Sequence, residues 1–336
     1  MSLMQSKFAV VTLHALGAAS LLTLSACDAP TPPREDVPKL AVDTGWPAIP
    51  AGAKFGEVSA VDVDAEGNVW VLHRAGRKWA EPFPDEPIAE PTVFKFSPQG
   101  KLIAQWGAGV FVMPHGISIA PDGKVWITDV AREQVLRFSP EGRQELALGE
   151  QGVTGQDAGH FGRPADVAFL PGRVLVADGY VNTRIAEYSA DGTFLRDWGD
   201  FAIAHAIAVD ERRIYVADRE NARIQIFDHT GTLVESRTSP AGNHTYALKP
   251  LGGGRLLALE GRDANDRTGA IVRAYGADGT IEASYDVGLP GADASLGHDL
   301  ALGPDGHIYA TDVRGGRVVR FSLPAPANRT NADQSR

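Results

Sequence analysis

The chain has 336 residues, of which 43% are hydrophobic, and this composition can supply a large buried core in one domain or two. Its formal net charge of -10 and pI of about 5.4 argue against nucleic acid or an anionic membrane surface as a partner, because both attract basic proteins. We therefore expect a small partner. Cys27 is the single cysteine, so no disulfide can form within the chain.

Residues 1–27 have the features of an export signal. Lys7 supplies a positive charge, an apolar run extends from Phe8 to Leu24, and the segment ends in Leu-Ser-Ala-Cys. This ending resembles a bacterial lipobox, so we expect Cys27 to be lipidated and to anchor the protein to a membrane, facing the periplasm, with no other membrane contact. Asp28 resembles the inner-membrane retention signal of some enteric bacteria, and inner and outer membrane both stay open. The alternative is a plain signal peptide with an incidental cysteine.

The rest of the chain divides into a tether, a folded body and a tail. Residues 28–47 are rich in proline, which predicts an extended tether. Between 48 and 323, short apolar and β-branched runs alternate with turn dipeptides such as Asp122-Gly123, a pattern that predicts successive β-hairpins. Residues 324–336 are polar and predict a disordered tail. We expect the folded body to be a monomer.

The folded body repeats roughly every 45 residues, a period typical of propeller blades with four strands each. Six copies can be aligned, and their first strands are expected to start near Val58, His115, Ala165, His205, Tyr246 and His298. Each copy has a landmark that we expect on its third strand, at His73-Arg74, Asp129, Asp178, Asp218, Glu260 and Asp312. The run from Asp218 to Phe227 resembles NHL-type repeats. The predicted fold is therefore all-β, a single six-bladed β-propeller of NHL-type repeats.

Three of the predicted first strands begin with a histidine. His115, His205 and His298 lie in the second, fourth and sixth copies, at separations of 90 and 93 residues, each two blade lengths. First strands line the channel of a propeller, so we expect the three imidazoles to converge at one level, about 120° apart. One such histidine alone would more often be structural. Three neutral imidazoles with an open fourth position form a catalytic zinc geometry.

Several runs of the chain resemble the lyase half of peptidylglycine α-amidating enzymes, which is peptidyl-α-hydroxyglycine α-amidating lyase. The runs match in order and spacing between about 55 and 322, and they are Val71-Leu72-His73-Arg74, Pro114-His115-Gly116, Thr128-Asp129-Val130-Ala131, Ala177-Asp178-Gly179-Tyr180-Val181-Asn182-Thr183-Arg184, Val216-Ala217-Asp218-Arg219-Glu220-Asn221-Ala222-Arg223-Ile224-Gln225 and His298-Asp299. NHL repeats alone would account for the aspartates. They would not account for three histidines together with Arg74 and Tyr180.

The resemblance implies two metal sites. Zinc would be held by His115, His205 and His298. A structural calcium in the channel would be bound by the carboxylate of Asp299 and by the main-chain carbonyls of Val61 and Ile117, since calcium prefers oxygen ligands.

The resemblance also implies a reaction. A small molecule or peptide that ends in α-hydroxyglycine would be cleaved to a primary amide and glyoxylate, with Tyr180 as the base for the carbinol hydroxyl. Arg74 matches the family arginine near the tyrosine, and a nearby guanidinium favours a phenolate. The sequence departs from the animal enzymes at Leu296-Gly297, where they have Met-Pro, and this bears on substrate specificity.

Two other functions stay open at this point. A propeller hydrolase or lactonase usually holds an axial calcium through carboxylates and asparagine, and the three histidines argue against it. A non-catalytic NHL-type propeller would bind a peptide or sugar at its face and would need no zinc.

Overall fold

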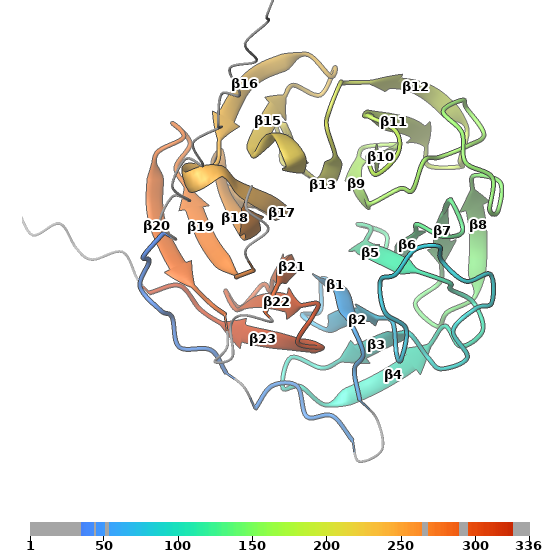
Figure 1. Ribbon diagram of the computed structural model, residues 1–336, viewed down its shortest axis with the longest axis horizontal. Helices are drawn as coiled ribbons and strands as arrows, with labels where there is room; N and C mark the ends of the chain where they lie inside the picture. Colours follow the sequence, from blue (N-terminus) through green and yellow to red (C-terminus); the bar gives the residue numbers. More distant parts are fainter. Residues whose placement is uncertain (1–34, 44, 51–53, 264–267, 289–294, 325–336) are drawn as a thin grey trace, which may run out of the picture. The chain divides into compact units, whose positions relative to one another are not determined.

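The computed structural model describes residues 35–43, 45–50, 54–263, 268–288 and 295–324, and within these ranges the regular structure is almost entirely β. Six antiparallel sheets surround a central axis, five of four strands and one of three (Figure 1). The strands of each sheet follow chain order, and the first strand of each lies nearest the axis. The prediction of a six-bladed β-propeller is confirmed.

The described strands group by blade as follows. Blade 1 contains β1 (Val58–Val63), β2 (Val69–His73), β3 (Val93–Phe96) and β4 (Leu102–Trp106); blade 2 contains β5 (Pro114–Ile119), β6 (Val125–Asp129), β7 (Gln134–Phe138) and β8 (Gln144–Leu148). Blade 3 contains β9 (Asp166–Leu170), β10 (Arg173–Asp178), β11 (Arg184–Ser189) and β12 (Phe194–Trp198); blade 4 contains β13 (Ala204–Val209), β14 (Ile214–Asp218), β15 (Arg223–Phe227) and β16 (Leu233–Thr238). Blade 5 contains β17 (Asn243–Gly252), β18 (Arg255–Asp263), β19 (Ile271–Tyr275) and β20 (Ile281–Asp286); blade 6 contains β21 (Gly297–Leu302), β22 (Ile308–Asp312) and β23 (Arg317–Phe321). Two short 3₁₀ turns, η1 (Arg219–Asn221) and η2 (Pro240–Gly242), complete the described elements.

The first strands begin within three residues of the predicted starts, but the landmarks were assigned to the wrong strand. Asp129, Asp178, Asp218 and Asp312 each end the second strand of a blade, and Glu260 and His73 also lie on second strands. A tight turn joins the first two strands, so the 13 or 14 residues between each histidine and its aspartate span one hairpin only.

In blades 2, 3, 4 and 6, the landmark aspartates fix the segment that enters the first strand. Asp129 is fully buried and accepts hydrogen bonds from the backbone N–H groups of Val112 (2.7 Å) and Met113 (3.0 Å), directly before β5. Asp312 accepts one from Leu296 (3.0 Å), directly before β21. Because buried backbone N–H groups must be paired, these carboxylates set where the histidine-bearing strands begin.

The core lies between neighbouring blades. Trp70 of blade 1 packs with Ile127 of blade 2, and Leu175 of blade 3 packs with Val216 of blade 4. Since each blade lies between two others, both faces of its inner strands are buried and their sequences are apolar in runs. These six interfaces hold the inner strands rigidly around the channel.

Residues 35–43 and 45–48, most of which the sequence analysis assigned to the tether, lie against the propeller. The N–H of Leu40 donates to the Asp286 carbonyl of β20 (2.9 Å), and the N–H of Asp43 donates to the Arg320 carbonyl of β23 (2.7 Å). Trp46 is 3% exposed and packs on Tyr309 at 4.7 Å between ring centroids. The segment thus lies where blade 6 has no fourth strand of its own among the described residues. We call residues 35–43 and 45–48 the N-terminal strap.

Among the described residues no helix is long and apolar enough to cross a membrane. The predicted signal at 1–27, Cys27, Asp28 and tail residues 325–336 lie outside the described residues.

Candidate active site

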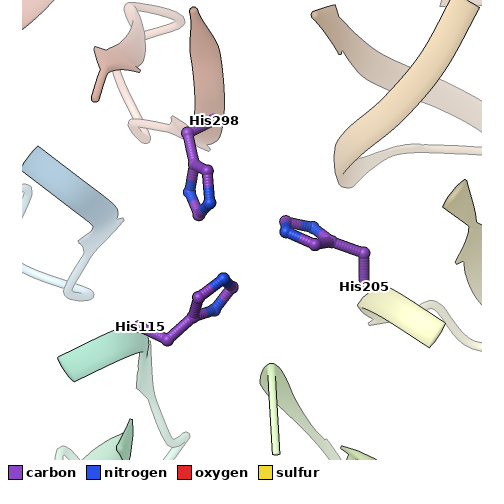
Figure 2. A group of neighbouring side chains, drawn as sticks. All are labelled: His115, His205 and His298. Carbon is purple, nitrogen blue, oxygen red and sulfur yellow. The ribbon is translucent and has the colours of Figure 1, made fainter. Parts of the chain in front are cut away.

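Three histidines meet at the axis. His115, His205 and His298 stand at the starts of β5, β13 and β21, the inner strands of alternate blades, and their rings point toward one another (Figure 2). One ring nitrogen from each lies within 4.8 Å of the others, and all three side chains are buried. The even spacing of the blades produces this convergence.

The neighbouring blades fix the tautomer of each ring. Nδ1 of His115, His205 and His298 lies 2.8, 2.8 and 2.6 Å from the carbonyl oxygens of Ala165, Tyr246 and Ser59, respectively. A carbonyl can only accept, so each Nδ1 carries the hydrogen and each Nε2 presents its lone pair. Gly116 makes the first contact possible, because a Cβ there would lie 2.6 Å from the Ala165 carbonyl oxygen.

Burial keeps the imidazoles neutral. It lowers the pKa of His298 to about 3, with a further contribution from the Arg74 charge. It also holds the pKa values of His115 and His205 well below the ordinary value, because a proton on either ring would be repelled by nearby guanidinium groups, those of Arg74 and Arg219 at His115 and that of Arg219 at His205. Neutral imidazole is the form that binds a metal ion.

Tyr180 lies on one side of the histidine cluster. Its hydroxyl is 2.9 Å from Nε2 of His115 and 3.1 Å from Nε2 of His205. Its ring packs against Trp79, which belongs to the long connection between β2 and β3. The phenol oxygen of Tyr180 therefore lies next to the Nε2 lone pairs of His115 and His205, which would bind a metal ion.

Arg74, at the end of β2, is buried beside this group. Its Nη1 donates to Glu57 (3.0 Å), its Nε donates to the Pro114 carbonyl (3.0 Å), and the guanidinium lies 5.1 Å from the Trp79 ring centroid. Nη2 is buried with no hydrogen-bond partner among the described residues. That N–H pair is available to a bound anion.

Arg219 was not singled out from the sequence, yet it directly contacts the tyrosine. Its Nη1 donates to the Tyr180 hydroxyl at 3.1 Å, and Glu220 holds the other side of the guanidinium. Arg219 is 6% exposed. A signal was present, because Arg219 directly follows the second-strand landmark Asp218, as Arg74 directly follows His73. These are equivalent positions in opposite blades.

A cavity of about 260 Å³ opens above the histidines. Its lining includes Arg74, Trp79, Tyr180, Arg219, Tyr246, Leu296, His298 and Val313. Tyr246, Leu296 and Val313 form one buried apolar cluster. The cavity thus offers cationic groups near Tyr180 and an apolar wall.

The donor set fits zinc at the histidines. Three neutral imidazoles with one open side are the ligands that catalytic zinc takes in proteins. The fixed Nδ1–H bonds orient all three Nε2 lone pairs before any ion arrives.

The residues implied for calcium lie just below. Asp299 accepts hydrogen bonds from the N–H groups of Val61 (2.9 Å) and Leu300 (2.8 Å), and Ile117 is buried on β5. Burial raises the pKa of Asp299 well above its ordinary value, and Asp166 adds to the effect. The carboxylate suits a hard cation, although Lys249 already brings a positive charge to the channel.

Some known proteins resemble this chain in sequence, and others resemble it in fold alone. Residues 201–227 match the NHL repeat family. The chain is 33% identical to "Peptidyl-glycine alpha-amidating monooxygenase B" of Xenopus laevis over 84% of this chain, and it spans only 35% of that protein's length. It is 30% identical to "Probable peptidyl-alpha-hydroxyglycine alpha-amidating lyase" of Caenorhabditis elegans, covering 80% of this chain and 83% of the relative. A gluconolactonase of Xanthomonas campestris shares the fold, with a TM-score of 0.58, 14% identity and coverage of 81% and 87%.

Fold and relatives together define a β-propeller protein of the carbon–nitrogen lyase class. Within that class, the chain belongs to the peptidyl-α-hydroxyglycine α-amidating lyase family.

Proposed function

We propose that this protein is a zinc-dependent lyase that cleaves N-acyl- or peptidyl-α-hydroxyglycine to a primary amide and glyoxylate. The observation that carries the proposal is the Tyr180 hydroxyl, which contacts two metal-ready imidazoles and Arg219 at the floor of the cavity. A base beside an electrophilic centre is what this elimination requires.

The reaction moves one proton and breaks one bond. The carbinol hydroxyl loses its proton, its oxygen forms the aldehyde C=O of glyoxylate, and the C–N bond electrons pass to the amide nitrogen. That nitrogen then takes a proton to give the primary amide. No oxidant or reductant is needed.

Tyr180 moves the proton in this scheme. As a phenolate, its oxygen takes the proton from the carbinol hydroxyl and returns it to the leaving amide nitrogen, which regenerates the phenolate. Arg219 donates to the same oxygen and stabilises negative charge there. A zinc ion held by Nε2 of His115, His205 and His298 would supply a Lewis acid beside this oxygen.

Arg74 is suited to bind the substrate carboxylate. Glu57 and the Pro114 carbonyl hold its guanidinium, which leaves Nη2 directed to no protein partner among the described residues. An ion pair there would orient the carbinol carbon toward Tyr180. The acyl part would lie along the apolar cluster of Tyr246, Leu296 and Val313.

Metal analysis and a product assay test the proposal together. We expect the purified protein to contain about one zinc per chain and to release glyoxylate from α-hydroxyhippurate, with activity lost on chelation and restored by zinc. His115→Ala should lose both zinc and activity, while His307→Ala, at a partly exposed position paired with Asp305, should keep both. Zinc without glyoxylate release would contradict the reaction, and absence of zinc would contradict the metal-dependent mechanism.

We further propose that the protein acts as a monomer anchored to a membrane through a lipidated Cys27 and facing the periplasm. The anchor is supported by the apolar N-terminal segment, which ends in Leu-Ser-Ala-Cys at Cys27. Metabolic labelling with a radioactive fatty acid should mark the parent and leave Cys27→Ser unlabelled, and labelling of both proteins would contradict the assignment. Membrane fractionation would then distinguish the inner from the outer membrane.

A further inference from the structure

Three carboxylates face the channel below the histidines, and each accepts an N–H from the inner strand of the next blade. The pairs are Asp62 with Ile119 (2.8 Å), Asp166 with Ile207 (3.0 Å) and Asp299 with Val61 (2.9 Å). They join blades 1 and 2, blades 3 and 4, and blades 6 and 1. The channel therefore collects three partly buried acidic groups.

A single lysine enters this group from blade 5. Nζ of Lys249, on β17, donates to Asp62 on β1 at 3.0 Å. Blade 6 lies between blades 5 and 1 around the ring, so this ion pair crosses part of the channel and joins two blades that are not neighbours (Figure 1).

The register places the ion pair below the histidine level. Lys249 comes three residues after Tyr246, and Asp62 comes three residues after Ser59. The carbonyls of Tyr246 and Ser59 are both acceptors for histidine Nδ1. Three residues of strand cover about 10 Å, so the backbones of Lys249 and Asp62 lie at one level, roughly that far along their strands from the two carbonyls.

Lys249 contacts Asp62 directly, and its charge also influences Asp166 and Asp299. Burial alone would lower the pKa of Lys249, but the carboxylates of Asp62, Asp299 and Asp166 outweigh burial and raise it, so the ammonium stays charged. Its charge in turn opposes the increase in pKa that burial causes at Asp166 and Asp299. It is thus a permanent cation among the channel acids.

We propose that Lys249 is the built-in structural cation of this channel: its ion pair with Asp62 joins blade 5 to blade 1 and supplies positive charge near Val61 and Asp299, for which the family resemblance implies calcium, so that the fold does not depend on calcium. A calcium ion at Asp299 would be repelled by the ammonium, which lowers its affinity by about tenfold or more. The inference concerns stability and metal content and does not rest on the lyase reaction.

Calcium binding and thermal unfolding of the full-length protein test this inference. The parent and Lys249→Met are dialysed against calcium-free buffer with zinc held constant, and calcium binding is then followed by equilibrium dialysis with radioactive calcium. We expect the parent to bind calcium weakly, with Tm unchanged by millimolar calcium. Lys249→Met should have a lower Tm, bind calcium at least tenfold more tightly and recover part of its Tm when calcium is added.

Two variants serve as controls. Lys95 forms a similar partly buried pair with Asp64 (3.0 Å) outside the channel, so Lys95→Met should lose stability without gaining a calcium response. Lys249→Arg keeps the positive charge, so it should bind calcium as weakly as the parent, and calcium should leave its Tm unchanged. A parent that retains calcium after dialysis, or whose Tm rises by several degrees with calcium, would overturn the inference. So would a folded Lys249→Met with no added calcium affinity.

Discussion

At the scale of single residues, the Tyr180 hydroxyl links the two halves of the site. It contacts His115 and His205 on the channel side and Arg219 on the cavity side. Since Arg219 is charged and buried, its hydrogen bond to the phenol is shielded from water and stronger than an exposed one would be. The phenol is therefore positioned by three polar groups before substrate binds.

Replacing Tyr180 with Phe should remove the proton carrier and leave the imidazoles in place. We expect zinc content and Tm near those of the parent and kcat lower by about 10²- to 10⁴-fold, the usual contribution of a general base. Tyr188→Phe is the matched control, because that hydroxyl bonds to the Ala158 carbonyl away from the histidines. Glyoxylate release by Tyr180→Phe at the parental rate would rule out the base assignment.

Arg219→Gln should affect turnover through Tyr180. The variant loses the charged donor to the phenol oxygen, so kcat should fall by on the order of 100-fold with zinc retained. Arg223→Gln is the control. The Arg223 guanidinium lies in the same hairpin but pairs with Asp218 and not with Tyr180, so the kcat of this variant should stay within a few-fold of the parent. Equal losses of kcat in both variants would mean that Arg219 acts only through stability.

His73 gives a pH dependence that is separate from the histidine cluster. Burial lowers its pKa from 6.5 to about 4, so between these values the unfolded chain binds a proton that the folded chain does not. Above pH 6.5 His73 is neutral in both the folded and the unfolded chain, and the stability is at its full value. As pH falls from 6.5 toward 4, proton uptake by the unfolded chain lowers the free energy of unfolding by about 3 kcal/mol. Urea unfolding at pH 7 and pH 4 should show that the parent loses about 3 kcal/mol more than His73→Gln. An equal loss in both proteins would contradict this.

At the scale of elements, the sequence could predict the hairpins because they are local. A dipeptide such as Asp122-Gly123 provides the positive φ of a tight turn, here +79° at the glycine, and alternating residues around it define the strands. The placement of the landmark carboxylates at the ends of second strands was missed, although the turn dipeptide Asp122-Gly123 between His115 and Asp129 indicates a single hairpin there. Their role is to bond to backbone that lies before the first strand, as Asp129 does with Val112.

The N-terminal strap shows that composition alone cannot distinguish a free tether from a segment that pairs with a sheet edge. A proline-rich extended segment has the same composition whether it is a tether or an added edge strand, because edge pairing uses backbone groups. The strap's partners on β20 and β23 are more than 240 residues away in sequence. Only the closed ring brings them together.

The strap should contribute to stability through Trp46. Its indole packs on Phe96 and Tyr309 and donates to the Pro98 carbonyl, so Trp46→Ala should lower the unfolding free energy by about 3 to 5 kcal/mol. Ile281→Ala, an exposed position on β20, should change it by roughly 0.5 kcal/mol or less. Chemical denaturation measures both, and a small loss for Trp46→Ala would mean that the strap is only loosely attached.

At the scale of the whole molecule, the three site histidines come from alternate blades of the six-bladed ring. Even-numbered blades supply the histidines, and odd-numbered blades supply the carbonyls that orient them. The equal spacing of His115, His205 and His298 was enough to predict that the rings converge. Lys249 could not be assigned in this way, because its partner Asp62 lies in another blade and no regular spacing along the chain relates the two. Arg219 could have been assigned, since it follows Asp218 as Arg74 follows His73.

This arrangement makes zinc a cross-link between blades 2, 4 and 6 if it binds as proposed. An ion that binds only the folded chain stabilises it by about 4 kcal/mol when free zinc exceeds Kd a thousandfold, which corresponds to roughly 8 °C in Tm for a chain of this size. Zinc-depleted protein should therefore unfold earlier by about that amount and recover on zinc addition. His205→Ala should lose this response, since one ligand and one bond to the Tyr246 carbonyl are removed, whereas His307→Ala should retain it. A zinc-dependent increase in Tm that persists unchanged in His205→Ala would place the ion elsewhere in the protein.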